Sequence, residues 1–531
     1  MNGLWKAAIA TTALIAVALT GCASGGSDDT ADDVRELVVG AADPVPDLTP
    51  GRQSNVYGLM MSVFSPLTFI DAEGELEYVA AESVESDDKV TWTITLRPDW
   101  TFHDGTPVTA QDYVDSWNAV ALGTNAFANS GQLASIVGYT DLNPAEGEPT
   151  TDEMSGLQVV DDHVFTVTLT HADSQFPVQL SQAQTAFYPM PQSAFDDLAA
   201  YGKKPIGNGP LALTTEWVEG EPLVAERFDD YKGTESTVDK ITWVPYSDRL
   251  TAYTDALAGN LDLSAVPATR ALQVSSDFDE ENIYSFSAPG MNYLGIPYWD
   301  ERFSDIRVRQ AISMAIDRDA INEAIYGGLN KPATAWTPAV MPGNPDGVCG
   351  KYCEYDPDAA AALLQEAGGF DGELTIHFPG GAGHEDLFNA IANSLRQNLG
   401  IEAVARPSVG WAEFGEARNT QTLDGPFFSR WGALYPSQQS TLRAMFSSAP
   451  VCKNCGGALS PDVDAALTQA DLTGGEDGTA YGQVQKILAQ NFPIVPLFDE
   501  SYNYVTSDRI EKLTASGVGE PILTEIVLTD D

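Results

Sequence analysis

The chain has 531 residues and a formal net charge of -49, because 76 Asp and Glu residues outnumber 27 Lys and Arg residues. This length allows a large hydrophobic core and predicts about two to four domains. The charge excludes a nucleic-acid-binding protein, since phosphate contacts need clusters of Lys and Arg, and the sequence has no such cluster. It also argues against binding to anionic lipid. A solvated acidic surface that keeps an exposed protein soluble accounts for the charge.

The first 21 residues have the pattern of a signal peptide, with Lys6, an apolar run over residues 7–19 and the sequence LTGC, which ends at Cys22. The run is about thirteen residues long, whereas a helix needs about twenty to span a bilayer. LTGC resembles the bacterial lipobox, in which cleavage leaves an acylated cysteine at the new N-terminus. We therefore expect Cys22 to be a lipid anchor, with an ordinary secretory signal as the alternative. Residues 22–36 are small, polar and acidic, which predicts a flexible tether.

Hydrophobic periodicity predicts a mixed α/β chain. Residues 90–96 and 163–169 alternate like half-buried strands. Residues 305–325 keep their apolar side chains largely on one side at helical spacing, which predicts one helix. Asp305 is its expected cap, and the glycines at 327 and 328 are its expected end.

Two further helices are predicted in the second half of the chain. One follows YDP at 355–357 and ends at the glycine pair 368–369, and the other covers residues 384–399 and ends at Gly400. Strand-like segments follow them at 373–378 and 401–407. This alternation of helix and strand is typical of an α/β lobe.

Four cysteines follow Cys22 in two close pairs, Cys349 with Cys353 and Cys452 with Cys455. Outside the cell an even number favours disulfides, although four cysteines permit three connectivities. Local pairs would clip short loops and remove little entropy from the unfolded chain. The alternative for the CxxxC and CxxC spacings is a structural zinc site.

Enzyme signatures are missing from the sequence, which has no GxSxG, HExxH, GxxxxGK[ST] or GxGxxG motif. The five histidines show no paired spacing for a metal. Carboxylates are too abundant to be informative. We therefore expect no catalytic residue, no metal and no other cofactor.

Residues 92–118, WTITLRPDWTFHDGTPVTAQDYVDSWN, closely resemble the segment that marks family-5 extracellular solute-binding proteins, which are the oligopeptide-, dipeptide- and nickel-binding components of ABC importers. In physical terms, a strand ends at Leu96, a turn follows, and Thr109 caps a helix. His103 and Asp104 are expected to hold the turn. Further segments with this resemblance are IGNGP (206–210), VDKITW (238–243), AYTDALAGNLDL (252–263), DIRVRQAISMAIDRDAI (305–321), YDPDAAAALLQEAG (355–368) and YGQVQKILAQNFPIVPLF (481–498).

The resemblance implies an α/β, two-lobed periplasmic-binding-protein-like fold of type II, cluster C, with an extra subdomain in its N-terminal part. The chain would cross between the lobes near residues 291–296 and 496–501. A ligand that touches both lobes would favour the closed state through its differential contacts. The implied bounds are 37–287 plus 500–531 for lobe I, with 83–205 as the extra subdomain, and 288–499 for lobe II.

Trp411 and Arg418 are the first candidates for ligand binding. They lie seven positions apart in GWAEFGEAR, a segment with a helical pattern, so they project from one face about two turns apart. The resemblance implies that this tryptophan and arginine border the pocket, with Trp411 against a ligand side chain and Arg418 against a carboxylate. The alternative is a core tryptophan and a surface arginine.

The segment RWGALYPS, 430–437, resembles the W-x-A-D-Y element of the peptide binders, whose aspartate accepts the α-ammonium of the ligand. This chain has Leu434 in that place, and leucine cannot pair a buried charge. Either another carboxylate substitutes, or the ligand has no free amine there. Trp431 and Tyr435 are candidates for the walls of the cleft, because aromatic rings offer contact area with few rotatable bonds.

Asn292 and Tyr293, at the expected crossing, complete the candidate ligand-binding residues. We expect an extracytoplasmic, monomeric lipoprotein, on the outer face of the cell membrane or in the periplasm. It would capture oligopeptides or dipeptides and deliver them to the permease and ATPase subunits of an ABC importer, touching the membrane only through its anchor. One alternative is the same fold with a sugar, a nickel chelate or another amine-free solute. The other is an extracellular hydrolase or adhesin built on the same lobes.

Overall fold

A computed structural model describes residues 34–41, 47–52, 57–181, 184–448, 450, 454–455, 461–473 and 478–529. The expected signal peptide and anchor, Cys22, lie outside these residues, as does Cys452. Arg35–Asp531 form one compact unit. The first strand begins at Glu36, the last residue of the expected tether, and the Arg35 guanidinium pairs with Asp239 at 3.0 Å.

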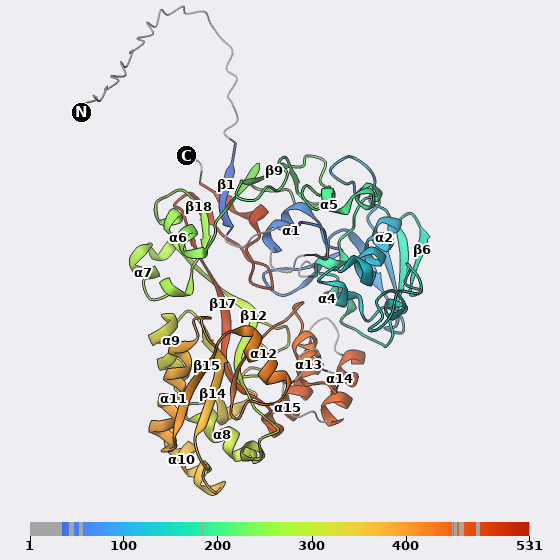
Figure 1. Cartoon of the computed structure of the whole chain (residues 1–531). Coiled ribbons are helices and arrows are strands. Elements are labelled where there is room, and N and C mark those ends of the chain that lie inside the picture. Colours follow the sequence, from blue (N-terminus) through green and yellow to red (C-terminus); the bar gives the residue numbers. More distant parts are fainter. Residues whose placement is uncertain are drawn as a thin grey trace, which may run out of the picture. The chain divides into compact units, whose positions relative to one another are not determined.

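In the described residues, the largest sheet has eleven strands (Figure 1). Their order across the sheet is β15 (Ala403–Ser408), β14 (Leu374–Pro379), β16 (Phe427–Gly432), β12 (Ile283–Gly295), β17 (Val495–Thr506), β11 (Leu263–Ala265), β1 (Glu36–Ala41), β10 (Lys240–Pro245), β9 (Leu223–Arg227) and β8 (Leu211–Leu213), with β13 (Lys331–Pro332) paired to β17 beside this path. β14 is parallel to β15 and β16, and β1 is parallel to β10 and β11. The sheet therefore contains two parallel groups, which the antiparallel strands β12 and β17 connect.

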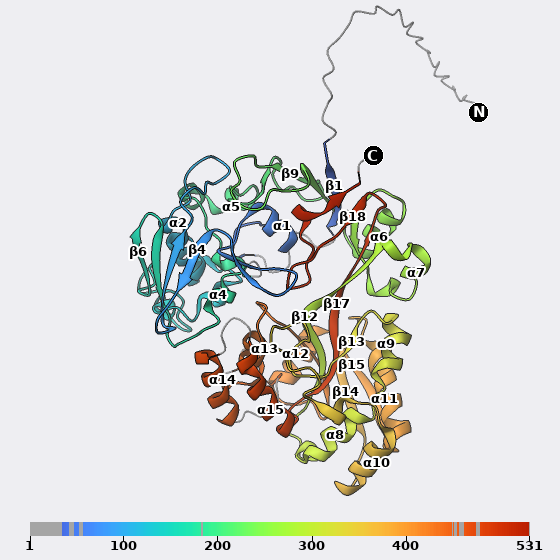
Figure 2. The same ribbon diagram turned by 180° about the vertical axis from the view of Figure 1, so that it is seen from behind.

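β12 and β17 are the long strands of this sheet. They pair antiparallel from Ile283 with Val505 to Leu294 with Val495, and the register is irregular between Ser287 and Met291. Figures 1 and 2 show them running from the elements around β1 to those around β14. The crossing expected near 291–296 and 496–501 falls in these two strands.

Buried side chains form separate cores along the chain. One core takes its residues from 291–498, a second from 67–201, and a third combines residues 37–263 around β1 and β10 with 510–526 near the C-terminus. This separation matches two lobes, an extra subdomain and a discontinuous first lobe. The residue bounds given above for the lobes stay a prediction.

The second core surrounds a four-stranded antiparallel sheet of β4 (Ala81–Glu85), β5 (Thr91–Leu96), β7 (Val164–Thr168) and β6 (Leu157–Asp161). β5 and β7 confirm the two strands predicted from alternation. Helix α2 (Ala110–Ala121) follows, and Thr109 caps it, as predicted. The structure adds a reciprocal pair of hydrogen bonds between Thr109 and Asp112.

The turn before α2 is tied to the IGNGP segment by His103. The amide of Gly207 donates to His103 Nδ1 at 3.2 Å, and Nε2 donates to the carbonyl of Gly209 at 3.0 Å. Burial lowers the pKa of His103 to about 4, so the imidazole is neutral at physiological pH. Asp104 accepts hydrogen bonds from Thr106. Both residues hold the turn, as the sequence predicts.

The other helices are α1 (Tyr57–Val63), α3 (Tyr139–Leu142), α4 (Phe176–Gln179), α5 (Leu198–Tyr201), α6 (Arg249–Leu257), α7 (Val274–Asp277), α8 (Ile306–Met314), α9 (Arg318–Tyr326), α10 (Pro357–Glu366), α11 (Glu385–Leu399), α12 (Trp411–Asn419), α13 (Gln438–Phe446), α14 (Pro461–Thr473) and α15 (Gly482–Asn491). Short strands β2 (Thr68–Ile70) and β3 (Leu76–Tyr78), and β18 (Ile510–Lys512) and β19 (Val527–Leu528), form two hairpin-like pairs. α11 ends at Gly400 with φ of 66°, and it lies between β14 and β15 in the chain, as predicted. Every helix in the described residues falls short of the length and hydrophobicity needed to span a bilayer.

The prediction of one helix over residues 305–325 is wrong, because the chain forms α8 and α9 with a break at 315–317. Asp317 adopts a non-helical conformation, and its side chain accepts a hydrogen bond from the amide of Ala320. It therefore starts a second helix. The expected cap Asp305 and the expected end at Gly327, with φ of 62°, are confirmed.

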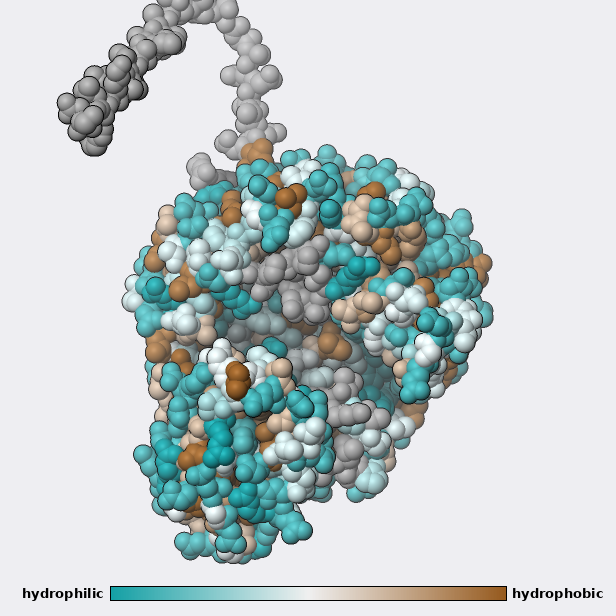
Figure 3. Space-filling view, in the orientation of Figure 1, coloured by the Kyte–Doolittle hydropathy of each residue, from teal (hydrophilic) through white to brown (hydrophobic). Residues whose placement is uncertain are grey.

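Cys349 and Cys353 are bonded to each other in the structure, with their Cα atoms 5.7 Å apart. Cys455 is also disulfide-bonded. The surface in Figure 3 is mainly hydrophilic, with hydrophobic residues scattered over it. This face is thus largely solvated, as expected from the large net charge.

The break between α8 and α9 is stabilised by a buried cation, Arg318, whose residue is 3% exposed. Its guanidinium donates to the main-chain carbonyls of Ser313 at 3.0 Å and Pro496 at 2.7 Å, the second of which is in β17. Burial lowers its pKa to about 10, so it stays charged at neutral pH. Arg318 thus joins two helices to the central strand.

We predict that Arg318→Met lowers the free energy of unfolding by about 3–5 kcal/mol, because at least two buried carbonyls lose their donor at about 1–3 kcal/mol each. The matched control is Arg307→Met, which removes an exposed arginine paired with Asp305 at the start of α8 and should change stability little. Urea unfolding followed by circular dichroism measures both variants. Equal stability of the two variants would contradict the role of Arg318.

Candidate ligand-binding site

The candidate site lies where β12, β16 and β17 pair, next to the carboxyl ends of the parallel strands β14, β15 and β16. Met291 pairs with Trp431 of β16 and with Asp499 of β17, so the three strands meet at this level. In open α/β sheets, ligands bind outside the carboxyl ends of parallel strands. Four of the candidate residues from the sequence, Asn292, Tyr293, Trp411 and Trp431, lie on these strands or directly after them.

One face of the pairing carries a charged cluster. Arg430 Nε donates to Glu500 Oε1 at 2.5 Å, and Arg430 Nη2 donates to Oε2 at 2.6 Å. The side-chain amide of Asn292 donates to the same carboxylate at 3.1 Å. Burial lowers the pKa of Arg430, but the hydrogen bonds and charge of Glu500 outweigh it and raise the pKa overall. Arg430 therefore stays charged, and Asn292 helps to orient the Glu500 carboxylate.

Two donors near these strands lack an acceptor among the described residues, Trp431 Nε1 of β16 and Arg418 Nε of α12. Ser429 donates to the hydroxyl of Tyr293 at 2.9 Å, and Tyr293 is fully buried in the core rather than exposed to ligand. Trp431 Nε1 and Arg418 Nε are also buried, and the described residues provide no acceptor for either. Burial lowers the pKa of Arg418, and the nearby Tyr293 opposes this shift. Buried N–H groups normally have partners, so these two are candidates to bind a ligand acceptor.

Trp411 begins α12, directly after β15, and 58% of it is exposed. Its ring contacts three aromatic side chains, with centroid distances of 5.9 Å to Phe428, 6.2 Å to His384 and 6.3 Å to Phe414. The ring is thus supported on one side and open on the other. This arrangement suits an aromatic wall for a ligand side chain.

Tyr435 belongs to a buried hydrogen-bond network that links distant parts of the chain. Its hydroxyl donates to Gln439 Oε1 at 2.7 Å. Gln439 Nε2 in turn donates to Asp173 at 2.8 Å and to Asp471 at 2.9 Å. Burial raises the pKa of Asp173, and the neighbouring charge of Asp471 raises it further. Sequence reasoning missed this network, because Asp173 is 266 residues from Gln439 and no local pattern connects the two.

Asp499 is a second buried carboxylate at the crossing. One oxygen accepts a hydrogen bond from the amide of Ala339 at 3.0 Å, and the other has no partner among the described residues. Burial raises its pKa to about 7; the Ala339 amide and Lys331 oppose this shift, and Asp346 and Glu500 add to it. Asp499 therefore changes its protonation state near neutral pH.

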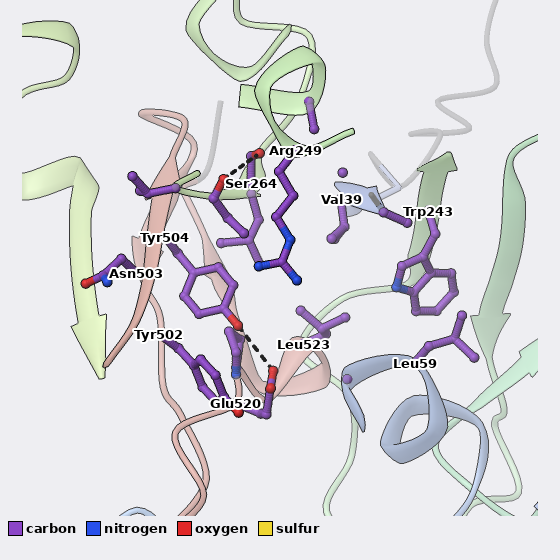
Figure 4. Close-up of a pocket in the computed structure, with 18 of the residues that line it drawn as sticks. Val39, Leu59, Trp243, Arg249, Ser264, Tyr502, Asn503, Tyr504, Glu520 and Leu523 are labelled. Atoms are coloured by element: carbon purple, nitrogen blue, oxygen red, sulfur yellow. Dashed lines mark hydrogen bonds between the residues drawn. The ribbon is translucent and has the colours of Figure 1, made fainter. Parts of the chain in front are cut away.

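A cavity of about 280 Å³ lies in lobe I, at the carboxyl ends of the parallel strands β1 and β11 (Figure 4). It is lined by Ser264, by Tyr502 and Tyr504 of β17, and by Trp243 of β10. Its charged lining residues are Arg249 of α6 and Glu520 near the C-terminus. Sequence reasoning missed all of these residues as ligand candidates, although Tyr502 and Tyr504 directly follow the expected crossing.

The structure therefore brings Asn292, Trp411 and Trp431 to the sheet ends and places Tyr293 in the core. Leu434, at the position of the family aspartate, is 45% exposed. In the described part of the chain, His, Cys, Asp and Glu side chains form no group of three or more that could hold a metal.

A two-lobed fold with a polar and aromatic site at the strand ends is the architecture of a solute-binding protein. The chain belongs to the bacterial extracellular solute-binding proteins of family 5, since the model of the family's middle region matches residues 75–451. The resemblance found in the sequence is thereby confirmed.

Among its relatives is the periplasmic murein peptide-binding protein MppA of Escherichia coli K12, which is 27% identical over 481 residues, 87% of each chain. The periplasmic oligopeptide-binding protein OppA of the same organism is 27% identical over 523 residues, 94% of each chain. The solved structure of MppA in its unliganded open form matches with a TM-score of 0.81 at 24% identity, over 93% of this chain and 98% of that one. This likeness confirms the predicted fold.

We predict that Asp499→Asn removes a pH-dependent loss of stability. The folded protein holds the Asp499 proton more tightly than the unfolded chain, whose pKa is about 3.9. The stability from this group is therefore fully present below about pH 4 and is lost as the pH rises toward 7. Relative to the native protein, the uncharged variant should gain up to about 1.4 kcal/mol per pH unit across this window and no more above it.

Urea unfolding of both proteins at several pH values measures this difference. The exposed Asp87, changed to Asn, is the matched control and should leave the pH profile unchanged. A stability difference between Asp499→Asn and the native protein that is constant with pH would refute the burial of an ionisable Asp499.

Proposed function

We propose that this protein is an extracytoplasmic binding lipoprotein that captures oligopeptides or dipeptides between its two lobes and delivers them to the permease and ATPase subunits of an ABC importer. The observation that carries the proposal is the pair of buried donors, Arg418 Nε and Trp431 Nε1, which have no acceptor among the described residues. Trp431 is on β16, and Arg418 is on α12, the helix that begins with the exposed Trp411. A peptide supplies carbonyl and carboxylate acceptors for such donors and side chains for such a ring.

Arg418 has the role of binding the carboxylate of the peptide. Its guanidinium is half-buried, so a carboxylate there would replace lost solvation with a charge-assisted hydrogen bond. The names of the relatives MppA and OppA, which bind murein peptide and oligopeptide, support a peptide as the ligand of this chain.

The remaining parts of the proposal concern attachment and assembly. Cys22 carries the acyl anchor, residues 22–35 act as a tether, and the protein works as a monomer without catalysis or cofactor. Two acyl chains suffice for stable attachment to a membrane. In the exported protein, the bond between Cys349 and Cys353 and a second bond between Cys452 and Cys455 clip local loops. The proposed lobe bounds are 287–288 and 499–500, and the crossing in β12 and β17 supports them.

A second candidate is the same fold with an amine-free solute, such as a sugar or a nickel chelate. Leu434 favours it, because this exposed leucine provides no counter-charge for an ammonium group. The two candidates differ in which compounds stabilise the folded protein, since only a bound ligand raises the midpoint of unfolding.

We predict that a pool of tetrapeptides with free carboxyl ends raises the thermal midpoint of the native protein and that Arg418→Ala loses this rise. Charged hydrogen bonds contribute about 1.5–3 kcal/mol, so the apparent affinity should fall about 10- to 100-fold. Thermal shift at a series of peptide concentrations measures both proteins. The matched control is Arg406→Ala, an arginine of β15 in the same lobe that pairs with Glu373.

An undiminished rise in Arg418→Ala would refute the role of Arg418. If the peptide pool gave no rise in the native protein while a sugar or a nickel chelate did, the second candidate would replace the first.

A further inference from the structure

The cavity in lobe I has an aromatic lining and a carboxylate, Glu520, whose one side-chain donor among the described residues is Tyr504. Trp243 is buried, and Tyr502 and Tyr504 are partly buried, so three rings border a space of about 280 Å³. Figure 4 shows Trp243 beside Leu59 on one side of the cavity and the two tyrosines on the other, with Glu520 close to Tyr504. Rings in this arrangement can face a bound cation, which is attracted to aromatic faces.

Among the described residues that line this cavity, the negatively charged one is Glu520. It accepts a hydrogen bond from the hydroxyl of Tyr504 at 3.2 Å, and among the described residues no other side chain donates to it. Burial raises its pKa, and the hydrogen bond from Tyr504 and the charge of Arg249 act in the opposite direction. A carboxylate with one neutral donor in a partly desolvated site gains from an added cation.

The positive charge of Arg249 does not outweigh the negative charge of Glu520 inside the cavity. It begins α6 and is more exposed than Glu520, and Figure 4 shows its side chain extending toward Tyr504. Its positive charge helps to keep Glu520 ionised. The less solvated of the two charges, and therefore the one that dominates recognition inside the cavity, is negative.

The two carboxylates at the crossing are less suited to bind a cation. Glu500 already accepts two hydrogen bonds from Arg430 and one from Asn292. Asp499 is buried against the amide of Ala339, where burial favours its neutral form. Glu520 is the carboxylate that lines an open volume.

We propose that the lobe I cavity binds a primary ammonium group of the ligand, with Glu520 as its counter-charge and Trp243, Tyr502 and Tyr504 as its walls. The inference rests on the proposed function, because it assigns the amino end of a peptide to lobe I. Arg418 and Trp431 of lobe II then bind acceptors elsewhere on the same ligand. A ligand held in this way contacts both lobes, as closure requires.

The test compares a pool of tetrapeptides that have free amino ends with the same pool after N-acetylation, which removes the charge and keeps the side chains. Apparent affinities come from thermal shifts at a series of pool concentrations. The native protein should bind the free pool about 10- to 100-fold more tightly than the acetylated pool. In Glu520→Gln this preference should disappear, while affinity for the acetylated pool stays the same. The matched control Glu511→Gln, at an exposed carboxylate of β18 in the same lobe, should keep the preference.

A preference that persists in Glu520→Gln, or equal binding of the two pools by the native protein, would overturn the inference and leave the proposed function standing. If the native protein bound neither pool, the proposed function would fail together with this inference.

The native protein alone provides a second readout, which does not depend on folding of the variant. Among the described residues, the titratable groups that line the cavity are Glu520, Tyr502, Tyr504 and Arg249. Burial raises the pKa of Glu520, so its protonation is the expected change as the pH is lowered from about 8 to about 4. The preference for free amino ends should therefore weaken as the pH falls through this range. A preference that is constant down to about pH 4 would contradict Glu520 as the counter-charge.

Discussion

The antiparallel pairing of β12 with β17 is the constraint on which the rest of the structure depends. Within one sheet, these strands join the parallel strands around β1 to the parallel strands around β14. β12 and β17 pair with each other over most of their length. The buried cores on either side are separate. A change in the angle between the cores therefore needs to bend only two strands, and the irregular pairing between Ser287 and Met291 lies where such bending is easiest. The lobe I cavity and the candidate residues of lobe II both lie beside this pairing, so bending of β12 and β17 changes their relative position.

The contact between residues 173–179 and the segment around α13 and α14 is polar rather than apolar. Gln439 bridges the carboxylates of Asp173 and Asp471, and Arg443 pairs with Asp471. When hydrogen-bonded groups separate, water can take the place of each partner, so the net cost is modest compared with exposing an apolar interface. Such a contact can form and break during a functional cycle. The two carboxylates at the crossing are also compensated: Glu500 pairs with Arg430, and burial favours the neutral form of Asp499. Glu520, near the C-terminus, lines the lobe I cavity.

Local signals in the sequence predicted much of the fold. The cap Thr109, the glycine at position 400 and the alternation of β5 and β7 each act within a few residues, and each appears in the structure. The break at Asp317 escaped prediction because the apolar periodicity continues through it, and Arg318 stabilises the break through a carbonyl of Pro496 far along the chain. The site was predicted only in part, because it also combines segments that are far apart in the chain. Trp411 and Trp431 lie in recognisable segments, whereas the cavity in lobe I combines residues from Val39 to Leu523 that only the fold brings together.

The central claim is that two rigid halves close on a peptide by bending at β12 and β17. Small-angle X-ray scattering of the purified protein, with and without a saturating pool of tetrapeptides, tests this claim most directly. The account predicts a smaller radius of gyration with peptide and a pool of unchanged mass after recovery. Superimposable scattering curves at a peptide concentration that saturates the thermal shift would contradict it.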